Sequence, residues 1–306
     1  MAQRILYFLV PGSNVSPFDV TIAADAGFDQ VIPLTGVRPE NVTAIVQDAI
    51  FCRPPKRFND TGIFIGGREV HVAADMFNIA ARAMVDDFRV GVFADPNGAY
   101  TTSASVVALV QRALIARTGT GFEGRTFAVF GAGPVGLCTA VLAAQLGAKA
   151  MLCQLTADDD ERSALRFCER YKAKVDWVPA ISQREKRQVL ARADVAVCAA
   201  KAGVRILDAE VLDAVERLQV VADTNAVPPS GIDGVNAHDR EALMQRAKGS
   251  FLSIGPLAIG SLKYKTQFAL FRAIQTSPEP ALLDFPDACR YATEELDKLD
   301  SIAAAA

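Results

Sequence analysis

Apolar and polar positions along the chain follow two alternating patterns. Short apolar runs, typical of strands buried in a sheet, alternate with longer stretches that have the composition of helices. The expected strands lie at residues 5–10, 31–34, 61–65, 89–94, 125–130, 149–155, 174–178, 194–199, 218–223 and 250–254. Strands that alternate with helices form parallel sheets, so the pattern predicts an α/β fold.

The helices between these strands carry start and stop signals. Ser16 suits an N-cap, Pro17 the first helical position and Asp19 the N3 position. Gly27 then stops this helix. Further helices are expected at about 39–51, 69–85, 101–117 and 134–146, and again within 257–299. The segment 118–121, Thr-Gly-Thr-Gly, is the best candidate for a hinge, so we expect two domains.

One uncharged stretch, residues 127–148, is long enough to span a membrane. Its spacing Gly131-x-Gly133-x-x-Gly136, between an expected strand and an expected helix, favours a dinucleotide-binding turn instead. In such a turn Gly131 permits the tight bend, Gly133 lets the backbone approach a pyrophosphate, and Gly136 lets helix and strand pack closely. N–H groups at the start of the helix would hold the phosphates. The alternative is a glycine turn with a structural role only.

The next strand lacks the acidic residue that usually binds a ribose. It ends in residues 154–156, Gln-Leu-Thr, with no carboxylate before Asp158 and no arginine before Arg162. The usual signal that distinguishes NAD from NADP is therefore missing. The acidic run 158–161 is interpreted as a solvated helix start.

Composition and charge argue against several classes of function, among them nucleic-acid binding, membrane binding and metal-dependent catalysis. Hydrophobic residues make up 51% and charged residues 22% of 306 residues, as in ordinary soluble proteins. A net charge of −3 gives no basic field for nucleic acid or an anionic membrane. The six cysteines include no C-x-x-C pair and the apolar run at 5–10 is too short for a secretory signal, so we expect a reduced, cytoplasmic protein. His71 and His238 have no Cys or His neighbour at ligand spacing, so we expect neither a metal site nor a Ser-His-Asp triad.

Three polar segments follow expected strands, at the end where α/β proteins bind ligands. Residues 95–102 also start a helix, so Asp95 is either a site residue or a helix cap. Residues 221–231 carry polar groups and a double proline. Residues 255–265 lead into a helix with Lys263 and Lys265, which are either site residues or exposed helix charges.

Six segments together resemble the bacterial methylene-tetrahydromethanopterin dehydrogenases of one-carbon metabolism. They follow the order of that family and cover essentially the whole chain. The segments are 16–20, 61–67, 93–102, 131–136, 222–229 and 257–265. The resemblance implies an α/β pterin domain, formed by residues 1–118 and 257–306, and a Rossmann-type domain with a doubly wound parallel sheet, residues 119–256.

The resemblance also implies the reaction. A methylene carbon between two nitrogens of a reduced pterin loses hydride to C4 of the nicotinamide of NAD or NADP, which leaves a methenyl cation. No proton is removed at the reacting carbon, so neither histidine nor a metal is required. In the NADP-dependent branch of the family an arginine and a lysine stand where this chain has Leu155 and Thr156. We therefore expect NAD to serve at least as well as NADP.

A cation that forms in the transition state would be stabilised by a fixed carboxylate nearby. On the resemblance we expect Asp95 and Lys263 to be catalytic, with Asp223 as the second choice of carboxylate. Asp19 ranks third as a catalytic carboxylate, because acidic residues are common at the N3 position of a capped helix and this structural role already accounts for its presence. The expected substrate-binding residues are Phe18, Asp19, Asn97, Thr101, Thr102 and Asn225. The expected cofactor-binding residues are Gly131, Ala132, Gly133, Pro134, Val135, Gly136, Gln154, Ala199, Ala200 and Asn225.

Two other functions remain open. A methylene-tetrahydrofolate dehydrogenase would use the same chemistry, and the basic loop with Arg53, Lys56 and Arg57 would meet an anionic tail on either pterin. A non-catalytic NAD(P)-binding sensor would keep the glycine turn but would not need Asp95 and Asn97 at strand ends. As partners we expect the pterin and other copies of the chain in a homo-oligomer, and neither nucleic acid nor a membrane.

Overall fold

The structure, a computed structural model, describes residues 3–305. The chain divides into two compact units, Met1–Thr101 with Lys263–Ala306, and Thr102–Leu262. The sequence placed the domain boundaries at 118 and 257, whereas the compact units change near residues 101 and 263. Two helices run across these boundaries, α4 (Ala99–Thr118) and α9 (Pro256–Thr276).

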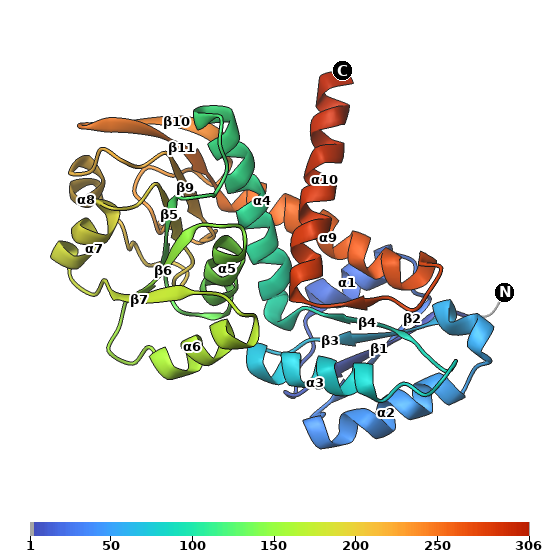
Figure 1. Cartoon of the computed structure of the whole chain (residues 1–306). Helices are drawn as coiled ribbons and strands as arrows, with labels where there is room; N and C mark the ends of the chain where they lie inside the picture. The colour runs from blue at the N-terminus through green and yellow to red at the C-terminus, as the bar shows by residue number, and fades with distance from the viewer. Residues whose placement is uncertain (1–2, 306) are drawn as a thin grey trace. The chain divides into compact units, whose positions relative to one another are not determined.

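Within the described residues, the first unit is built on a parallel sheet with the strand order β12-β4-β3-β1-β2. The strands are β1 (Ile5–Val10), β2 (Gln30–Thr35), β3 (Thr61–Ile65), β4 (Gly91–Ala94) and β12 (Leu282–Leu283). The other helices are α1 (Pro17–Asp25), α2 (Pro39–Phe51), α3 (Val70–Arg82) and α10 (Phe285–Ala305), with short 3₁₀ helices η1 (Pro55–Asp60) and η2 (Pro96–Gly98). Figure 1 shows α2 and α3 on one face of this sheet and α1 and α9 on the other.

Aromatic side chains and the glycines Gly62 and Gly91 fix α9 on the sheet. The ring of Phe271 on α9 lies 5.0 Å from that of Phe64 and 5.2 Å from that of Phe93, centroid to centroid. A Cβ atom on Gly91 would lie 2.6 Å from Cγ2 of Ile274, which is too close for any side chain. Glycine at this position therefore lets α9 pack directly against the backbone of β4. Close packing of this kind holds the preceding turns of α9 in place.

Within the described residues, the second unit is built on a sheet with the order β10-β11-β9-β8-β5-β6-β7. The strands are β5 (Thr126–Phe130), β6 (Lys149–Gln154), β7 (Val175–Pro179), β8 (Val195–Cys198), β9 (Val220–Asp223), β10 (Arg240–Arg246) and β11 (Gly249–Ile254). The helices are α5 (Pro134–Gln145), α6 (Glu161–Arg170), α7 (Gln183–Leu190) and α8 (Ala209–Asp213). The pairs are parallel except β10 with β11. Apart from β10, this is the strand order of a doubly wound Rossmann sheet, which confirms the predicted fold class.

The uncharged stretch at 127–148 belongs to the second unit and is no single helix. It contains the buried strand β5, the glycine turn and α5, and the face of the sheet under α5 is apolar. In the part of the chain that the structure describes, no helix combines the length and the apolar character needed to cross a membrane.

All ten predicted strands are present within residues 3–305, but the sequence analysis missed β10, β12, α7 and α8. Strand β10 contains charged and amide side chains and lies at the edge of its sheet, where Leu243 is 59% exposed. An edge strand of this kind has no continuous apolar run for a sequence pattern to detect. Its antiparallel pairing also corrects the expectation of a fully parallel sheet.

Candidate active site

The strand order of the first unit reverses at β1, which lies between β2 and β3. The connections that leave β1 and β3 run to α1 and α3 on opposite faces of the sheet, so their loops separate at the carboxyl ends of the strands (Figure 1). Ligands of open α/β sheets bind at such a point. A cavity of about 670 Å³ lies here, lined by residues 10–17, residues 67–69, Phe8, Asp19 and Asn97.

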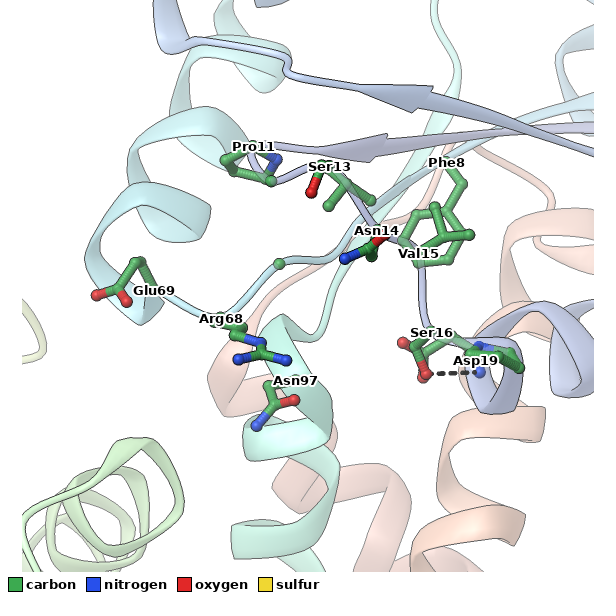
Figure 2. A pocket seen from close by; sticks show the side chains of 14 residues that line it. Phe8, Pro11, Ser13, Asn14, Val15, Ser16, Asp19, Arg68, Glu69 and Asn97 are labelled. Carbon is green, nitrogen blue, oxygen red and sulfur yellow. Dashed lines mark hydrogen bonds between the residues drawn. The ribbon is translucent and has the colours of Figure 1, made fainter.

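Polar groups occupy much of the cavity wall. Figure 2 shows Ser13 and Asn14 on the loop after β1, and Arg68 directed toward Asn97. Asn97 adopts a left-handed conformation, φ 53°, in the turn between β4 and α4, a conformation that Asn tolerates better than most residues. Asp19 reaches the cavity from the first turn of α1. The structure therefore brings two predicted substrate-binding residues, Asp19 and Asn97, to the same cavity.

A chain of charge-assisted contacts links α1 to α9 beside this cavity. Asp19 is 4% exposed, and its Oδ1 accepts a hydrogen bond of 2.7 Å from Nε2 of Gln267. Oε1 of the same Gln267 accepts a hydrogen bond of 2.8 Å from Nζ of Lys263. This ammonium lies 3.8 Å from the ring centroid of Phe18, within cation–π distance. Lys263 is thus no freely exposed helix charge, and Phe18, Asp19 and Lys263 form one cluster.

Asp95 is fully buried at the end of β4 and caps α4. Its Oδ1 accepts hydrogen bonds from the backbone N–H groups of Tyr100 (2.9 Å) and Thr101 (3.2 Å). Its Oδ2 accepts one of 2.6 Å from the Thr101 hydroxyl. The helix-cap interpretation of Asp95 is therefore correct, and the Thr101 hydroxyl already has a partner in the protein. Thr102, the next residue, is partly buried.

Burial changes the ionisation of this cluster. It raises the pKa of Asp95 to about 6, an effect that Lys263 opposes and Asp19 increases. Burial also raises the pKa of Asp19 and lowers the pKa of Lys263, while both carboxylates oppose the change at Lys263. Above about pH 6 the carboxyl group of Asp95 is mostly ionised, which places a negative charge beside the cavity.

The second unit has its own reversal of strand order at β5, which lies between β6 and β8. Gly131 adopts φ +114°, and a Cβ atom on it would lie 2.8 Å from the carbonyl oxygen of Ala199. A Cβ atom on Gly136 would lie 1.9 Å from the Gly131 oxygen. Gly133 differs, because a Cβ atom there would meet nothing within 4 Å. The predicted residues Ala199 and Ala200 thus lie against the glycine turn, and open space adjoins Gly133 at the N-terminus of α5.

A carboxylate that the sequence did not single out organises the loop after β6. Asp159 accepts hydrogen bonds from the N–H groups of Leu155 (2.7 Å) and Thr156 (3.1 Å) and from the Thr156 hydroxyl (3.0 Å). Gln154 donates to the Thr156 carbonyl at 3.0 Å. This loop adjoins the glycine turn, because Gly131 N–H donates to the carbonyl of Cys153. Asp159 therefore adds a negative charge beside Leu155 and Thr156. These are the positions at which the NADP-dependent branch is expected to have an arginine and a lysine for the 2′-phosphate.

The predicted site residues after β9 hold their own loop. Oδ1 of Asn225 accepts from the N–H groups of Gly203 (3.2 Å) and Val227 (2.9 Å), and Nδ2 donates to the Pro229 carbonyl at 2.8 Å. Asp223 is fully buried and accepts from the N–H of Asn225 at 2.9 Å. The structure thus gives the Asn225 amide and the Asp223 carboxylate contacts that form this loop, and the catalytic ranking of Asp223 as the second choice stays a prediction.

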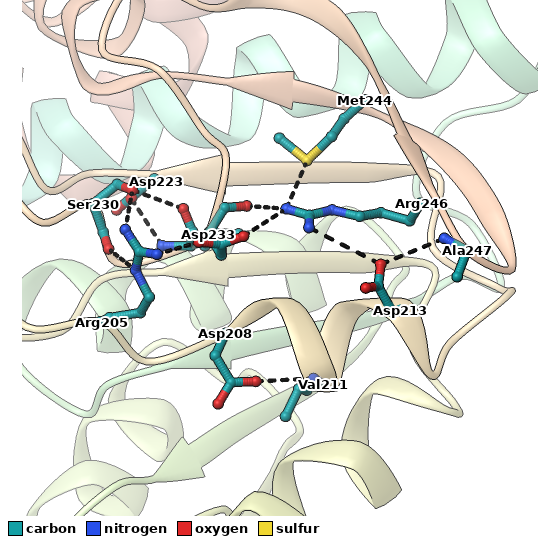
Figure 3. A network of polar contacts seen from close by, with 11 residues as sticks. Arg205, Asp208, Val211, Asp213, Asp223, Ser230, Asp233, Met244, Arg246 and Ala247 are labelled. Carbon is teal, nitrogen blue, oxygen red and sulfur yellow. Dashed lines mark hydrogen bonds and ion pairs between the residues drawn. The ribbon is translucent and has the colours of Figure 1, made fainter.

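Ion pairs stabilise the same loop from its far end. Figure 3 shows Arg246 of β10 between Asp213 and Asp233, with Arg205 on the other side of Asp233. These pairs tie β10, which the sequence missed, to the loop that follows β9. In the first unit, by contrast, Asp60 pairs with two arginines of the basic loop, Arg53 and Arg57, so these charges already have partners in the chain.

Comparison with known proteins gives consistent results along the whole chain. A family model described as methylene-tetrahydromethanopterin dehydrogenase, N-terminal, matches residues 17–97. The chain is 42% identical over 298 residues to an NAD(P)-dependent methylenetetrahydromethanopterin dehydrogenase of Methylorubrum extorquens, covering 96% of this chain and 99% of that protein. It is 30% identical over 280 residues to bifunctional protein MdtA of the same organism, covering 91% and 94%.

Among solved structures, shikimate 5-dehydrogenase from Listeria monocytogenes, determined with shikimate and NAD, is similar in fold. The two chains align with a TM-score of 0.52 over 96% of each, at 14% sequence identity. At this identity the likeness shows the fold alone.

The glycine turn yields a test of its geometry by stability. In Gly136→Ala the added Cβ would overlap the Gly131 carbonyl, so we expect a loss of about 2 kcal/mol or more in unfolding free energy. Gly133→Ala adds the same atom in open space at φ −71°, and we expect a change of at most about 0.5 kcal/mol. Chemical denaturation of both variants checks this, and equal losses would contradict the described turn.

Proposed function

The chain belongs to the family of NAD(P)-dependent methylene-tetrahydromethanopterin dehydrogenases, and on that premise we propose how its own residues carry out the reaction. It is an oxidoreductase that transfers a hydride from methylene-tetrahydromethanopterin to NAD(P) and gives methenyl-tetrahydromethanopterin. The observation that carries this conclusion is the 42% identity over 96% of the chain.

NAD(P) supplies the hydride acceptor of the reaction. The residues present fit this cofactor, because Gly131 and Gly136 allow a close turn and Gly133 leaves open space at a helix N-terminus. The N-cap position of α5, Gly133, has no side chain that could bind the first N–H groups of the helix. These groups are therefore available to a pyrophosphate.

The cavity of the first unit is the proposed pterin site. Its volume of about 670 Å³ falls in the usual range for ligand pockets, and its wall combines apolar residues with polar groups that can bind a heterocycle. Phe18 and Asp19 on α1 and Asn97 after β4 would orient the pterin. The site has to hold a planar ring system and exclude water, because water attacks a methenyl cation.

The charge cluster would stabilise the cation as it forms. Asp95 has no surface in the cavity wall, so it acts through its field rather than through contact. The attraction is strong because the surroundings exclude water. Burial raises the pKa of both Asp95 and Asp19, and Lys263 opposes this rise, so it favours their ionised forms. Its proposed role is thus to maintain two buried carboxylates beside the reacting carbon.

The two other functions differ from this proposal in defined ways. A tetrahydrofolate enzyme would use the same cluster, and Arg68 at the cavity could meet an anionic tail of either pterin. A non-catalytic sensor would not need Asp95, Asp19 and Lys263 to be buried together. Burial of three ionisable groups costs desolvation free energy, so their presence favours a catalytic role. Homo-oligomer formation and a cytoplasmic location stay predictions.

An absorbance assay tests the function and the choice of coenzyme together. We expect methylene-tetrahydromethanopterin to reduce NAD, seen as reduced nicotinamide, at least as efficiently as NADP. The reason is that Asp159 would repel the 2′-phosphate of NADP and no arginine or lysine stands at 155 or 156. Leu155→Arg should improve kcat/KM for NADP and leave that for NAD nearly unchanged.

Three results of this assay would contradict the proposal. Activity only with methylene-tetrahydrofolate would replace the substrate, and no reduction with either pterin would favour the sensor. An efficiency for NADP tenfold or more above that for NAD, about 1.4 kcal/mol, would show that the loop after β6 does not select the coenzyme.

Gly133→Val tests the proposed phosphate site. The branched side chain would fill the open space at the start of α5 without straining the backbone, so the fold should persist while coenzyme affinity falls. Fluorescence titration with NADH measures the affinity, and Gly133→Ala serves as the smaller matched variant. An affinity within twofold of wild type, about 0.4 kcal/mol, would rule out this site.

Asp95→Asn tests the electrostatic role. The amide keeps the shape and can still accept from the N–H groups of Tyr100 and Thr101, but it has no charge. We expect turnover to fall roughly 100-fold to 1,000-fold with unchanged coenzyme affinity. Wild-type turnover should also decline as pH falls through about 6, because Asp95 then gains a proton, and the part of the acid limb that Asp95 causes should be absent in the variant. A variant with a lower Tm and normal turnover would leave Asp95 as a helix cap only.

A further inference from the structure

We propose that Gln267 is a positioning residue of the reaction, which holds the Asp19 carboxylate and the Lys263 ammonium at fixed places beside the pterin cavity. The inference rests on the proposed function, because it gives those two charged groups a task. None of the motifs in the sequence pointed to Gln267. Its assignment comes from the two hydrogen bonds of one fully buried amide.

The two bonds of Gln267 leave its amide only one orientation. An ionised carboxylate can only accept and an ammonium can only donate, so Nε2 must face Asp19 and Oε1 must face Lys263. Both bonds are short, 2.7 Å and 2.8 Å, and each includes a charged partner. Charge-assisted bonds are about twice as strong as neutral ones. A group that is held on both sides in this way cannot rotate without breaking them.

The backbone of α9 supports this position. Lys263 and Gln267 are four residues apart, so both side chains project from the same face of the helix. One turn further along, Phe271 packs against Phe64 and Phe93 of the sheet. The helix is therefore fixed by its core contacts. Because Gln267 projects from this fixed helix, its hydrogen bond restricts where the Asp19 carboxylate of α1 can lie.

Gln267 also separates two opposite charges. It bonds to both groups, so neither has to turn toward the other to find a partner. The donated N–H lowers the pKa of Asp19, which burial raises. The charged groups that act on Asp19 are Lys263 on α9 and, through mutual repulsion, Asp95 at the end of β4. Loss of the donor should therefore shift the protonation of Asp19 to higher pH.

Two substitutions separate the functions of the amide. Gln267→Met has a similar volume and removes both bonds, whereas Gln267→Glu keeps an acceptor for Lys263 and removes the donor to Asp19. Gln275→Met is the matched control, because Gln275 is a buried glutamine on the same helix that donates to the Ala26 carbonyl and contacts neither charged group. The profile of kcat against pH is measured for all three and for wild type, with Tm as a check on folding.

We expect kcat at pH 7 to fall roughly 10-fold to 100-fold in Gln267→Met, the range for a lost bond to a charged group. The acid limb of the kcat profile should move to higher pH in both Gln267 variants and stay in place in Gln275→Met. The KM for the coenzyme should not change in any of them.

Two outcomes distinguish a failure of this inference from a failure of the function. An active wild type whose acid limb is the same in both Gln267 variants would overturn the role of Gln267 alone, and so would an equal shift in Gln275→Met. A wild type that reduces no coenzyme with either methylene pterin would overturn the proposed function, and the role of Gln267 with it.

Discussion

Carboxylates buried at the carboxyl ends of parallel strands are the constraint on which both candidate sites depend. An ionised carboxylate can be buried only if hydrogen bonds or opposite charges compensate for the lost water. Asp95 after β4 and Asp223 at the end of β9 are both fully buried, and both accept hydrogen bonds from N–H groups of the following residues. Each therefore fixes the loop that follows its strand, at the edge of the sheet where ligands bind.

The same interaction would let a structural role and the proposed functional role coincide at Asp95. The hydrogen bonds that make it a helix cap also hold its charge at a fixed place, and a fixed charge needs no reorganisation when a cation forms. Burial raises the pKa of Asp95 to about 6, so the carboxylate still ionises at neutral pH. At Asp223 the cation that acts on the carboxylate is the guanidinium of Arg205, and the N–H groups of Asn225 and Ile232 donate to it. The two buried carboxylates therefore differ in the cation that acts on them, Lys263 at Asp95 and Arg205 at Asp223.

Most of the fold could be predicted from the sequence, because buried strands appear as apolar runs and the glycine spacing marks one turn. Ser16 was also correctly identified as an N-cap, since capping is local. The charge cluster could not be predicted in full, because Asp19 and Gln267 are 248 positions apart and no local pattern joins them. The N3 position of Asp19 is real, and its carboxylate bonds to Gln267 of α9 as well as to Ser16 at its own helix terminus. Asp159 was missed because it lies in an acidic run in which only Asp160 caps the helix.

The central claim is that the pterin binds in the cavity of the first unit, beside Asp19 and Lys263. A crystal structure of the protein with bound methenyl- or methylene-tetrahydromethanopterin tests it most directly. The account predicts density for the pterin rings between residues 10–17 and 67–69, with Asp19 and Asn97 within hydrogen-bond distance of the ligand and Gln267 still bonded to Asp19 and Lys263. A pterin bound anywhere outside this cavity, with the cavity itself empty, would contradict the account.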